Sequence, residues 1–135
     1  MADFDPTFGT LPLALTDPAA AEALFAPLAH ESVEVAAFAY LGEGQRLLGI
    51  RHARSASADT LDLSVREVAA DALAFGAQGV VMAHNHPGGD PTPSHADRDA
   101  TRLLVRALDP LGVRLLDHLV VAEGGTVSFR SLGLL

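Results

Sequence analysis

The sequence predicts a single-domain α/β sandwich in which helices pack on a mainly antiparallel or mixed β-sheet. Helix-like and strand-like segments follow one another in the order helix, two strands, helix, strand, helix, two strands. The chain has 135 residues, of which 49% are hydrophobic and 19% charged, so it can bury one core and is not disordered. No repeat, low-complexity tract or linker divides it.

The N-terminal half is predicted to hold one helix and a β-hairpin. The segment Thr16-Asp17-Pro18 offers a capping residue and a proline ahead of an alanine-rich run, which is typical of a helix start. Two strand-like segments follow, and the two glycines between them predict a hairpin turn. The expected bounds are an irregular lead-in over 1–16, a helix over 18–28, strands over 33–41 and 46–52, and a short strand-like segment over 60–63.

The C-terminal half is predicted to alternate between helices and strands. Ser64 and Glu67 have the spacing of a capping box, which marks the start of a helix. A continuous apolar run then predicts a buried central strand, and a loop rich in proline and glycine separates it from the next helix. The expected bounds are helices over 64–75 and 94–108, strands over 79–84, 113–122 and 126–129, and a rigid loop over 87–93.

The composition excludes several classes of function. There are no cysteines, so a disulfide framework, a thiolate nucleophile and a cysteine-based metal site are excluded. All nine basic residues are arginine, so the chain has no lysine for a Schiff base or a phosphate-binding P-loop. The formal net charge of −8 repels phosphate backbones, so nucleic acid is not an expected partner.

The N-terminal segment carries no positive charge of the kind that precedes a secretory signal. No apolar run approaches the roughly 20 residues that span a membrane. We therefore expect a cytoplasmic protein without membrane contact.

Two histidines and one aspartate form the strongest candidate for a metal site. Because residues two apart on a strand point to the same face, His84 and His86 can share one metal ion at the end of the buried strand. Asp97 lies in line with the apolar stripe of the next helix, and a carboxylate directed into a core needs a donor, a cation or a metal as its partner. These three residues leave a fourth position open, as catalytic zinc sites do.

Each of these residues also has a simpler interpretation. The two histidines would then be hydrogen-bonded separately, and Ser94 and Asp97 would form a capping box at the start of the helix. For His118, a hydrogen-bonded core histidine is favoured over a residue that supports the metal ligands.

A hydrolytic metal site needs a general base for its water. Glu31 and Glu34 lie at the start of the first predicted strand. Strand periodicity alone does not choose between them, and the simpler interpretation of either is a solvated surface acid.

The spacing His84-x-His86-Pro87, six residues, Ser94, two residues, Asp97, with a glutamate well upstream, resembles the motif of the JAMM (MPN-plus) metallohydrolases. The RadC-like branch of that family is the closer resemblance, and it covers residues 30–135. The further positions that resemble this branch are 65–68, 83–87, 90–94, Thr101 and 116–118.

The resemblance implies a curved mixed sheet flanked by helices, the cytidine-deaminase-like or MPN fold. Residues 1–29 would then be a lead-in and helix ahead of a JAB domain at 30–135. The resemblance also implies one zinc ion held by His84, His86 and Asp97.

Two catalytic roles are implied as well. The distance along the sequence from Glu34 to Arg46 fits the family's glutamate and Glu31 does not, so Glu34 is the expected general base. Ser94 corresponds to the serine that helps to stabilise the oxyanion.

We therefore expect a zinc-dependent hydrolase that cleaves a peptide or isopeptide bond in a protein or peptide substrate. The alternatives are a non-catalytic MPN-type scaffold, a DNA-repair-associated RadC-like module, which the negative charge disfavours, and a non-haem iron oxygenase, because two histidines and one carboxylate also bind Fe(II). The sequence identifies neither the substrate nor the oligomeric state.

Overall fold

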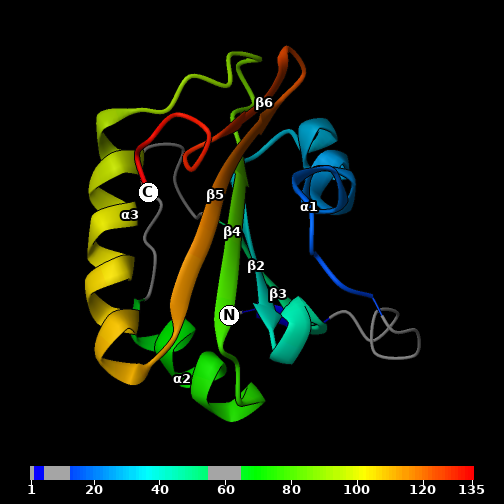
Figure 1. The fold of residues 1–135 in the computed structure, drawn as a ribbon. Helices are drawn as coiled ribbons and strands as arrows, with labels where there is room; N and C mark the ends of the chain where they lie inside the picture. Colours follow the sequence, from blue (N-terminus) through cyan, green and yellow to red (C-terminus); the bar gives the residue numbers. More distant parts are fainter. Residues whose placement is uncertain (1, 5–12, 55–64) are drawn as a thin grey trace.

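A mixed β-sheet lies between two helical layers in the computed structural model, which describes residues 2–4, 13–54 and 65–135 (Figure 1). The strands are β1 (Ala2–Phe4), β2 (Val35–Leu41), β3 (Leu47–Arg54), β4 (Gly79–Asn85), β5 (Arg114–Ala122) and β6 (Gly125–Ser128). They form one six-stranded sheet in the order β1-β3-β2-β4-β5-β6. All neighbouring strands are antiparallel except β4 and β5, which are parallel.

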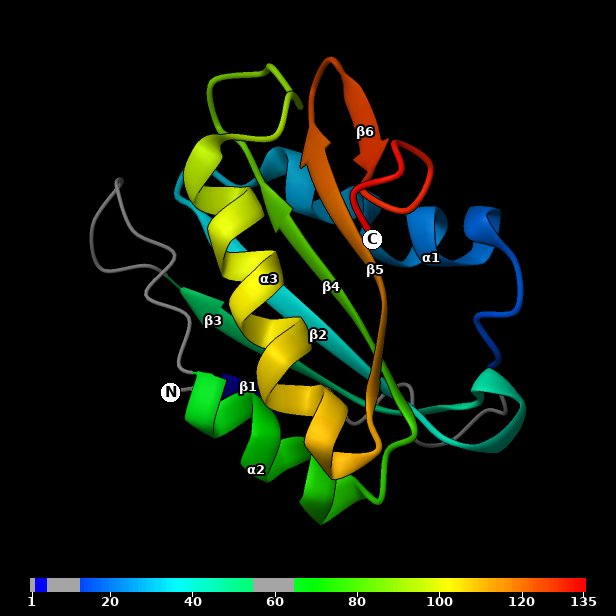
Figure 2. The same cartoon turned by 60° about the vertical axis from the view of Figure 1, so that its left-hand side comes forward.

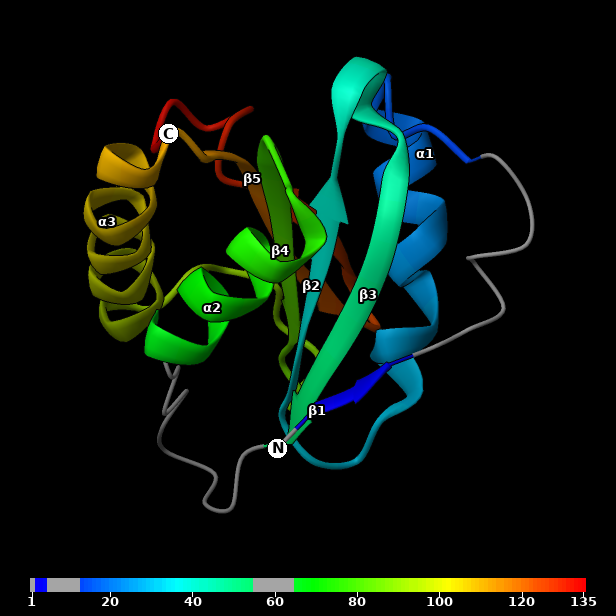
Figure 3. The ribbon, with the colours of Figure 1, turned by 90° about the horizontal axis from the view of Figure 1, so that it is seen from below.

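Helices cover both faces of this sheet. They are α1 (Pro18–Phe25), α2 (Val65–Phe75) and α3 (His95–Leu108), with short 3-10 helices η2 (Ala26–His30), η3 (Glu43–Gln45) and η4 (Asp109–Leu111). One face is covered by α1 and η2, and the opposite face by α2 and α3 (Figures 2 and 3). The fold class is confirmed as an α+β sandwich with a mixed sheet.

The central strands β2 and β4 are buried on both faces, and their side chains alternate between two cores. The core under α1 includes Val81 and Ala83 of β4, whereas Val80 and Met82 face α2 and α3. By the same alternation, His84 belongs to the face that α3 covers. The sheet therefore decides which side chains near the end of β4 can meet α3.

The first helix, the first predicted strand and the hairpin turn differ from the sequence prediction, and the bounds of the other predicted helices and strands that the structure describes agree to within two residues. The first helix ends at Phe25, because Pro27 lacks the N–H that would continue it. The first predicted strand, β2, begins at Val35 and not at 33, because the carbonyl of Val33 and the N–H of Val35 bond to the side chain of Asn85 and not to the main chain of β4. The predicted hairpin turn contains η3, in which Gly44 adopts a φ of 68°.

The predicted irregular lead-in over 1–16 is wrong at its start, since β1 pairs with β3 through the register Ala2↔Ala53 to Phe4↔Arg51. A strand of three residues is too short to show an alternating pattern. The strand-like segment expected at 60–63 lies outside the described residues.

Across the described ranges, no helix combines the length and the apolar character needed to cross a membrane.

The packing of α3 predicts a contrast between two adjacent leucines. Leu104 is fully buried, whereas Leu103 is 56% exposed. Leu104→Ala is expected to lower the free energy of unfolding by about 2–5 kcal/mol, because it leaves a cavity in the core. Leu103→Ala is the matched control and should change that free energy by about 0.5 kcal/mol or less. Urea denaturation measures both, and equal losses would contradict the assignment of the buried face.

Candidate metal centre

Three possible metal ligands meet where β4 ends and α3 begins. His84 and His86 lie on and directly after β4, and Asp97 lies in the first turn of α3. The Nε2 atoms of the two histidines are 3.0 Å apart. Each Nε2 is 3.1 Å from a carboxylate oxygen of Asp97. These residues form a group that could hold one metal ion.

The connection between β4 and β5 explains why these residues meet. Because β4 and β5 are parallel, the chain must cross from the end of β4 to the start of β5, and α3 makes this crossing. The first turn of such a helix lies close to the carboxyl end of the strand before it. The helix therefore presents Asp97 to the histidines.

Asp97 serves two purposes at once. Its N–H donates to the Oγ of Ser94 at 3.1 Å, and its carboxylate accepts from the N–H of Ser94 at 2.8 Å, so the two residues form a capping box. The same carboxylate contacts both histidines and is only 2% exposed. The helix cap and the contact with the histidines are therefore compatible.

The Asp97 carboxylate is ionised at neutral pH. Burial alone would raise the pKa of Asp97, but a protonated His84 and the hydrogen bonds from Ser94 outweigh burial and hold that pKa well below its usual range. A charged carboxylate thus faces the two imidazoles.

A main-chain carbonyl fixes the orientation of His86. Its Nδ1 lies 2.9 Å from the carbonyl oxygen of Asp90. A carbonyl only accepts hydrogen bonds, so Nδ1 carries the proton, and in the neutral ring Nε2 has a free lone pair. The side chain of Asp90 in turn accepts hydrogen bonds from the N–H and the hydroxyl of Thr92, which stiffens the loop.

A chain of hydrogen bonds fixes the orientation of His84 in the same way. The hydroxyl of Thr101 donates to the carbonyl oxygen of Asp97 at 2.8 Å, so it accepts from Nδ1 of His118 at 2.6 Å. The Nε2 of His118 then accepts from Nδ1 of His84 at 2.7 Å. In the neutral ring, the proton of His84 therefore lies on Nδ1, and its Nε2 has a free lone pair.

His118 is well suited to this role. Burial, and then the proximity of His84, lower the pKa of His118 well below its usual value, so its ring is neutral and can accept a hydrogen bond. Its ring also stacks on Phe129, with centroids 4.4 Å apart. The favoured interpretation of His118 as a hydrogen-bonded core residue agrees with these contacts, and its partner is His84 itself.

The arrangement fits a cation. Two imidazole lone pairs and an ionised carboxylate converge within 3.0–3.1 Å of one another, with no proton between them in this tautomeric state. Such a set of acceptors is electrostatically unfavourable unless a positive charge lies among them. Two imidazoles and one carboxylate suit zinc and other first-row divalent ions.

The two glutamates considered as general base lie in different surroundings. Glu34 directly precedes β2, and the alternation that places Ala36 on the α3 side places Glu34 on the side of His84. Burial raises the pKa of Glu34, and so does Asp97, whereas His84 and His86 lower it. Glu31 instead forms an ion pair with Arg54 at 3.4 Å near the surface.

The loop between β4 and α3 packs against the tip of the β5–β6 hairpin. The N–H of His86 donates to Val121 of β5, and the N–H of Gly124 donates to the carbonyl oxygen of Gly89 at 3.1 Å. A Cβ atom at Gly124 would lie 2.7 Å from that oxygen, so only glycine allows the loop to approach this closely.

The sequence analysis gave no role to two residues of this region, Thr101 and Asn85, although both belong to the positions that carry the family resemblance. Both are buried polar residues. Thr101 lies four residues after Asp97 on the buried face of the helix, and Asn85 is the last residue of a fully buried strand. A buried polar side chain must be hydrogen-bonded, and that rule was the available signal.

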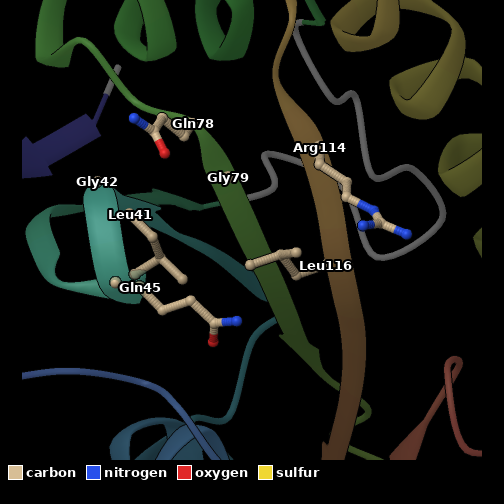
Figure 4. A pocket seen from close by; sticks show the side chains of 8 residues that line it. Leu41, Gly42, Gln45, Gln78, Gly79, Arg114 and Leu116 are labelled. Carbon is tan, nitrogen blue, oxygen red and sulfur yellow. The ribbon is translucent and has the colours of Figure 1, made fainter.

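A pocket of about 300 Å³ lies at the opposite end of β4, beside Gly79 (Figure 4). Leu41 and Leu116 form its apolar part, and Gln45 and Gln78 its polar part. None of the residues of the metal centre lines this pocket.

Comparison with known proteins gives one family. The sequence matches the RadC-like JAB domain over residues 15–134. A UPF0758 protein of Symbiobacterium thermophilum is 40% identical over 122 residues, which are 90% of this chain and 52% of that protein. A UPF0758 protein of Xanthomonas axonopodis pv. citri is 37% identical over 121 residues, 89% of this chain and 54% of that protein. The chain thus spans about half the length of these relatives.

The support behind His84 predicts a specific loss of metal affinity. His118→Leu removes the acceptor that holds the proton of His84 on Nδ1, so zinc affinity should fall by about 10–100-fold. His95→Ala is the matched control, because His95 is an exposed histidine at the start of α3. Competition with a chromophoric chelator measures both variants. Equal affinities in the two variants would show that His118 does not support the metal ligands.

Proposed function

Since this chain belongs to the RadC-like JAB domain family, we propose that it is a zinc-dependent hydrolase that cleaves a peptide or isopeptide bond in a protein or peptide substrate. One observation carries this proposal: two imidazole lone pairs and an ionised carboxylate converge on one point, and Glu34 lies on the same face of the sheet.

His84, His86 and Asp97 would hold the zinc ion and leave its fourth position open to water. Bound there, zinc would supply Lewis acidity, which lowers the pKa of water toward about 7 and polarises a carbonyl group. Because hydrogen bonds at Nδ1 already orient both imidazole rings, the protein needs no rearrangement to offer these ligands.

Glu34 would act as the general base. Its carboxylate would take a proton from the attacking water and pass it to the nitrogen of the leaving amine. Burial raises the pKa of Glu34, which brings its proton affinity closer to that needed for exchange near neutral pH. Its half-buried position leaves it accessible to substrate.

Ser94 would stabilise the oxyanion that develops on the substrate carbonyl. Its oxygen accepts a hydrogen bond from the N–H of Asp97, and its own proton is then available to donate outward. Its side chain is exposed at the start of α3, next to the metal ligands. A hydroxyl placed there can donate to the substrate oxygen.

The donor set also bears on the alternatives. Non-catalytic scaffolds of the MPN type usually lose metal ligands, whereas this chain keeps His84, His86 and Asp97. An iron oxygenase generally carries its two histidines and carboxylate on a β-barrel, whereas Asp97 lies on a helix.

The proposal predicts separate effects on metal binding and on turnover. The zinc-loaded chain, incubated in ¹⁸O-water with mixed peptides and isopeptide-linked peptides, should release products that carry one ¹⁸O atom. Glu34→Gln should keep zinc and lower turnover by about 10²–10⁴-fold, because it removes the base. His84→Ala should lose zinc. Mass spectrometry of the products and of the native protein measures these effects.

Glu31→Gln is the matched control, since Glu31 pairs with Arg54. It should retain both zinc and turnover. Loss of turnover in Glu31→Gln but not in Glu34→Gln would move the base to Glu31. A fully loaded chain that releases no labelled product would contradict the proposed hydrolase.

A further inference from the structure

Asn85 lies between the two histidine ligands but faces the other way. It is the last residue of β4 and is 1% exposed. Strand alternation directs His84 toward α3 and Asn85 toward the opposite face, where α1 and η2 lie. The side chain of Asn85 therefore does not touch the candidate metal centre.

The amide of Asn85 makes three hydrogen bonds to the segment that leads into β2. Its Oδ1 accepts from the N–H of Val35 at 2.6 Å. Its Nδ2 donates to the carbonyl oxygens of Val33 at 2.9 Å and Glu31 at 3.2 Å. One donor and two acceptors among the partners fix which amide atom is oxygen and which is nitrogen.

Two of these bonds grip the peptide groups on either side of Glu34. The carbonyl of Val33 belongs to the peptide unit before the Glu34 Cα, and the N–H of Val35 belongs to the unit after it. With both units anchored, the two backbone dihedrals of Glu34 are constrained, and so is the direction in which its side chain leaves the chain.

On the side of β4, no strand pairing holds these peptide groups. Val35 pairs with Arg54 of β3, but Glu34 lies outside β2, and pairing between β2 and β4 starts only at Ala36↔His84. One residue earlier, the side chain of Asn85 takes the place of the main-chain ladder. The strand that carries the histidines is thereby joined to the glutamate through a single amide.

We propose that Asn85 is a positioning residue that holds Glu34 toward the metal ligands. This inference rests on the proposed role of Glu34 as general base. The His84-Asn85-His86 segment then sets both parts of the site: its two histidines offer metal ligands on one face of the sheet, and its asparagine fixes the base from the other. A misplacement of about 1 Å can cost about 10²-fold in rate. The clamp that the Asn85 hydrogen bonds form on either side of Glu34 can therefore have a large effect on turnover.

The test uses Asn85→Leu, which keeps the size of the side chain and removes all three hydrogen bonds. The turnover number should fall by about 10²-fold with little change in KM. Zinc affinity should fall far less than the 10–100-fold that is typical when a ligand loses its support. Ser128→Ala is the matched control. Ser128 is the last residue of β6, and the substitution removes its two side-chain hydrogen bonds, to Asp117 and Ser131. That control should change neither quantity.

A readout without substrate separates this inference from the proposed function. In protein labelled with ¹³C at the glutamate carboxyls, zinc should shift the Glu34 signal, which is assigned by its loss in Glu34→Gln. In Asn85→Leu the shift should be largely lost while zinc still binds. A zinc-loaded wild type that cleaves nothing contradicts the hydrolase, and the zinc response of Glu34 still tests the clamp.

Amide hydrogen exchange tests directly whether Asn85 holds the N–H of Val35, also in the case where Asn85→Leu does not fold. The Val35 amide of the wild-type chain should be as protected as the amides inside β2, and it should exchange faster in Asn85→Leu. If Asn85→Leu does not fold, the wild-type measurement alone decides, and an unprotected Val35 amide overturns the clamp. Faster exchange at Val35 with an unchanged Glu34 response and turnover number also overturns it.

Discussion

Hydrogen bonds to the Nδ1 atoms of His84 and His86 determine which ring nitrogens are free to bind a metal ion. The carbonyl of Asp90 and the neutral ring of His118 each accept a hydrogen bond from an imidazole Nδ1–H, so in the neutral rings of His84 and His86 both Nε2 lone pairs point at Asp97. Thr101 completes this set of hydrogen bonds, because it joins His118 to the main chain of Asp97. The hydrogen bonds thus link β4, β5 and α3 around the three candidate ligands of a cation.

The sheet provides the geometry for this ring. Parallel pairing of β4 and β5 requires a crossing helix, and the crossing places Asp97 at the carboxyl end of β4. The same pairing brings His118 of β5 to the rear of His84. Side chains alternate between the two faces of the sheet along β4, so the histidines lie on one face and Asn85 on the other.

Local patterns predicted the helices, the strands of the central sheet and the juxtaposition of His84, His86 and Asp97, since each depends on residues near one another in sequence. The edge strand β1 has only three residues, and the start of β2 depends on a side chain 50 residues away. The partners of His118 and Asn85 are likewise distant in sequence, so neighbouring residues did not indicate them. Strand periodicity did not distinguish Glu31 from Glu34 for the same reason: Arg54, which pairs with Glu31, lies on another strand.

In the site as proposed, two imidazoles and one carboxylate, and no other histidine, bind a single ion. X-ray absorption spectroscopy of the chain loaded with one equivalent of zinc reports the ligands of that ion. We expect a four-coordinate shell with two imidazole nitrogens at about 2.0–2.1 Å and the remaining positions filled by oxygen. A shell without imidazole scattering, or one with a third imidazole, would contradict it, because the first denies the site and the second makes His118 a ligand.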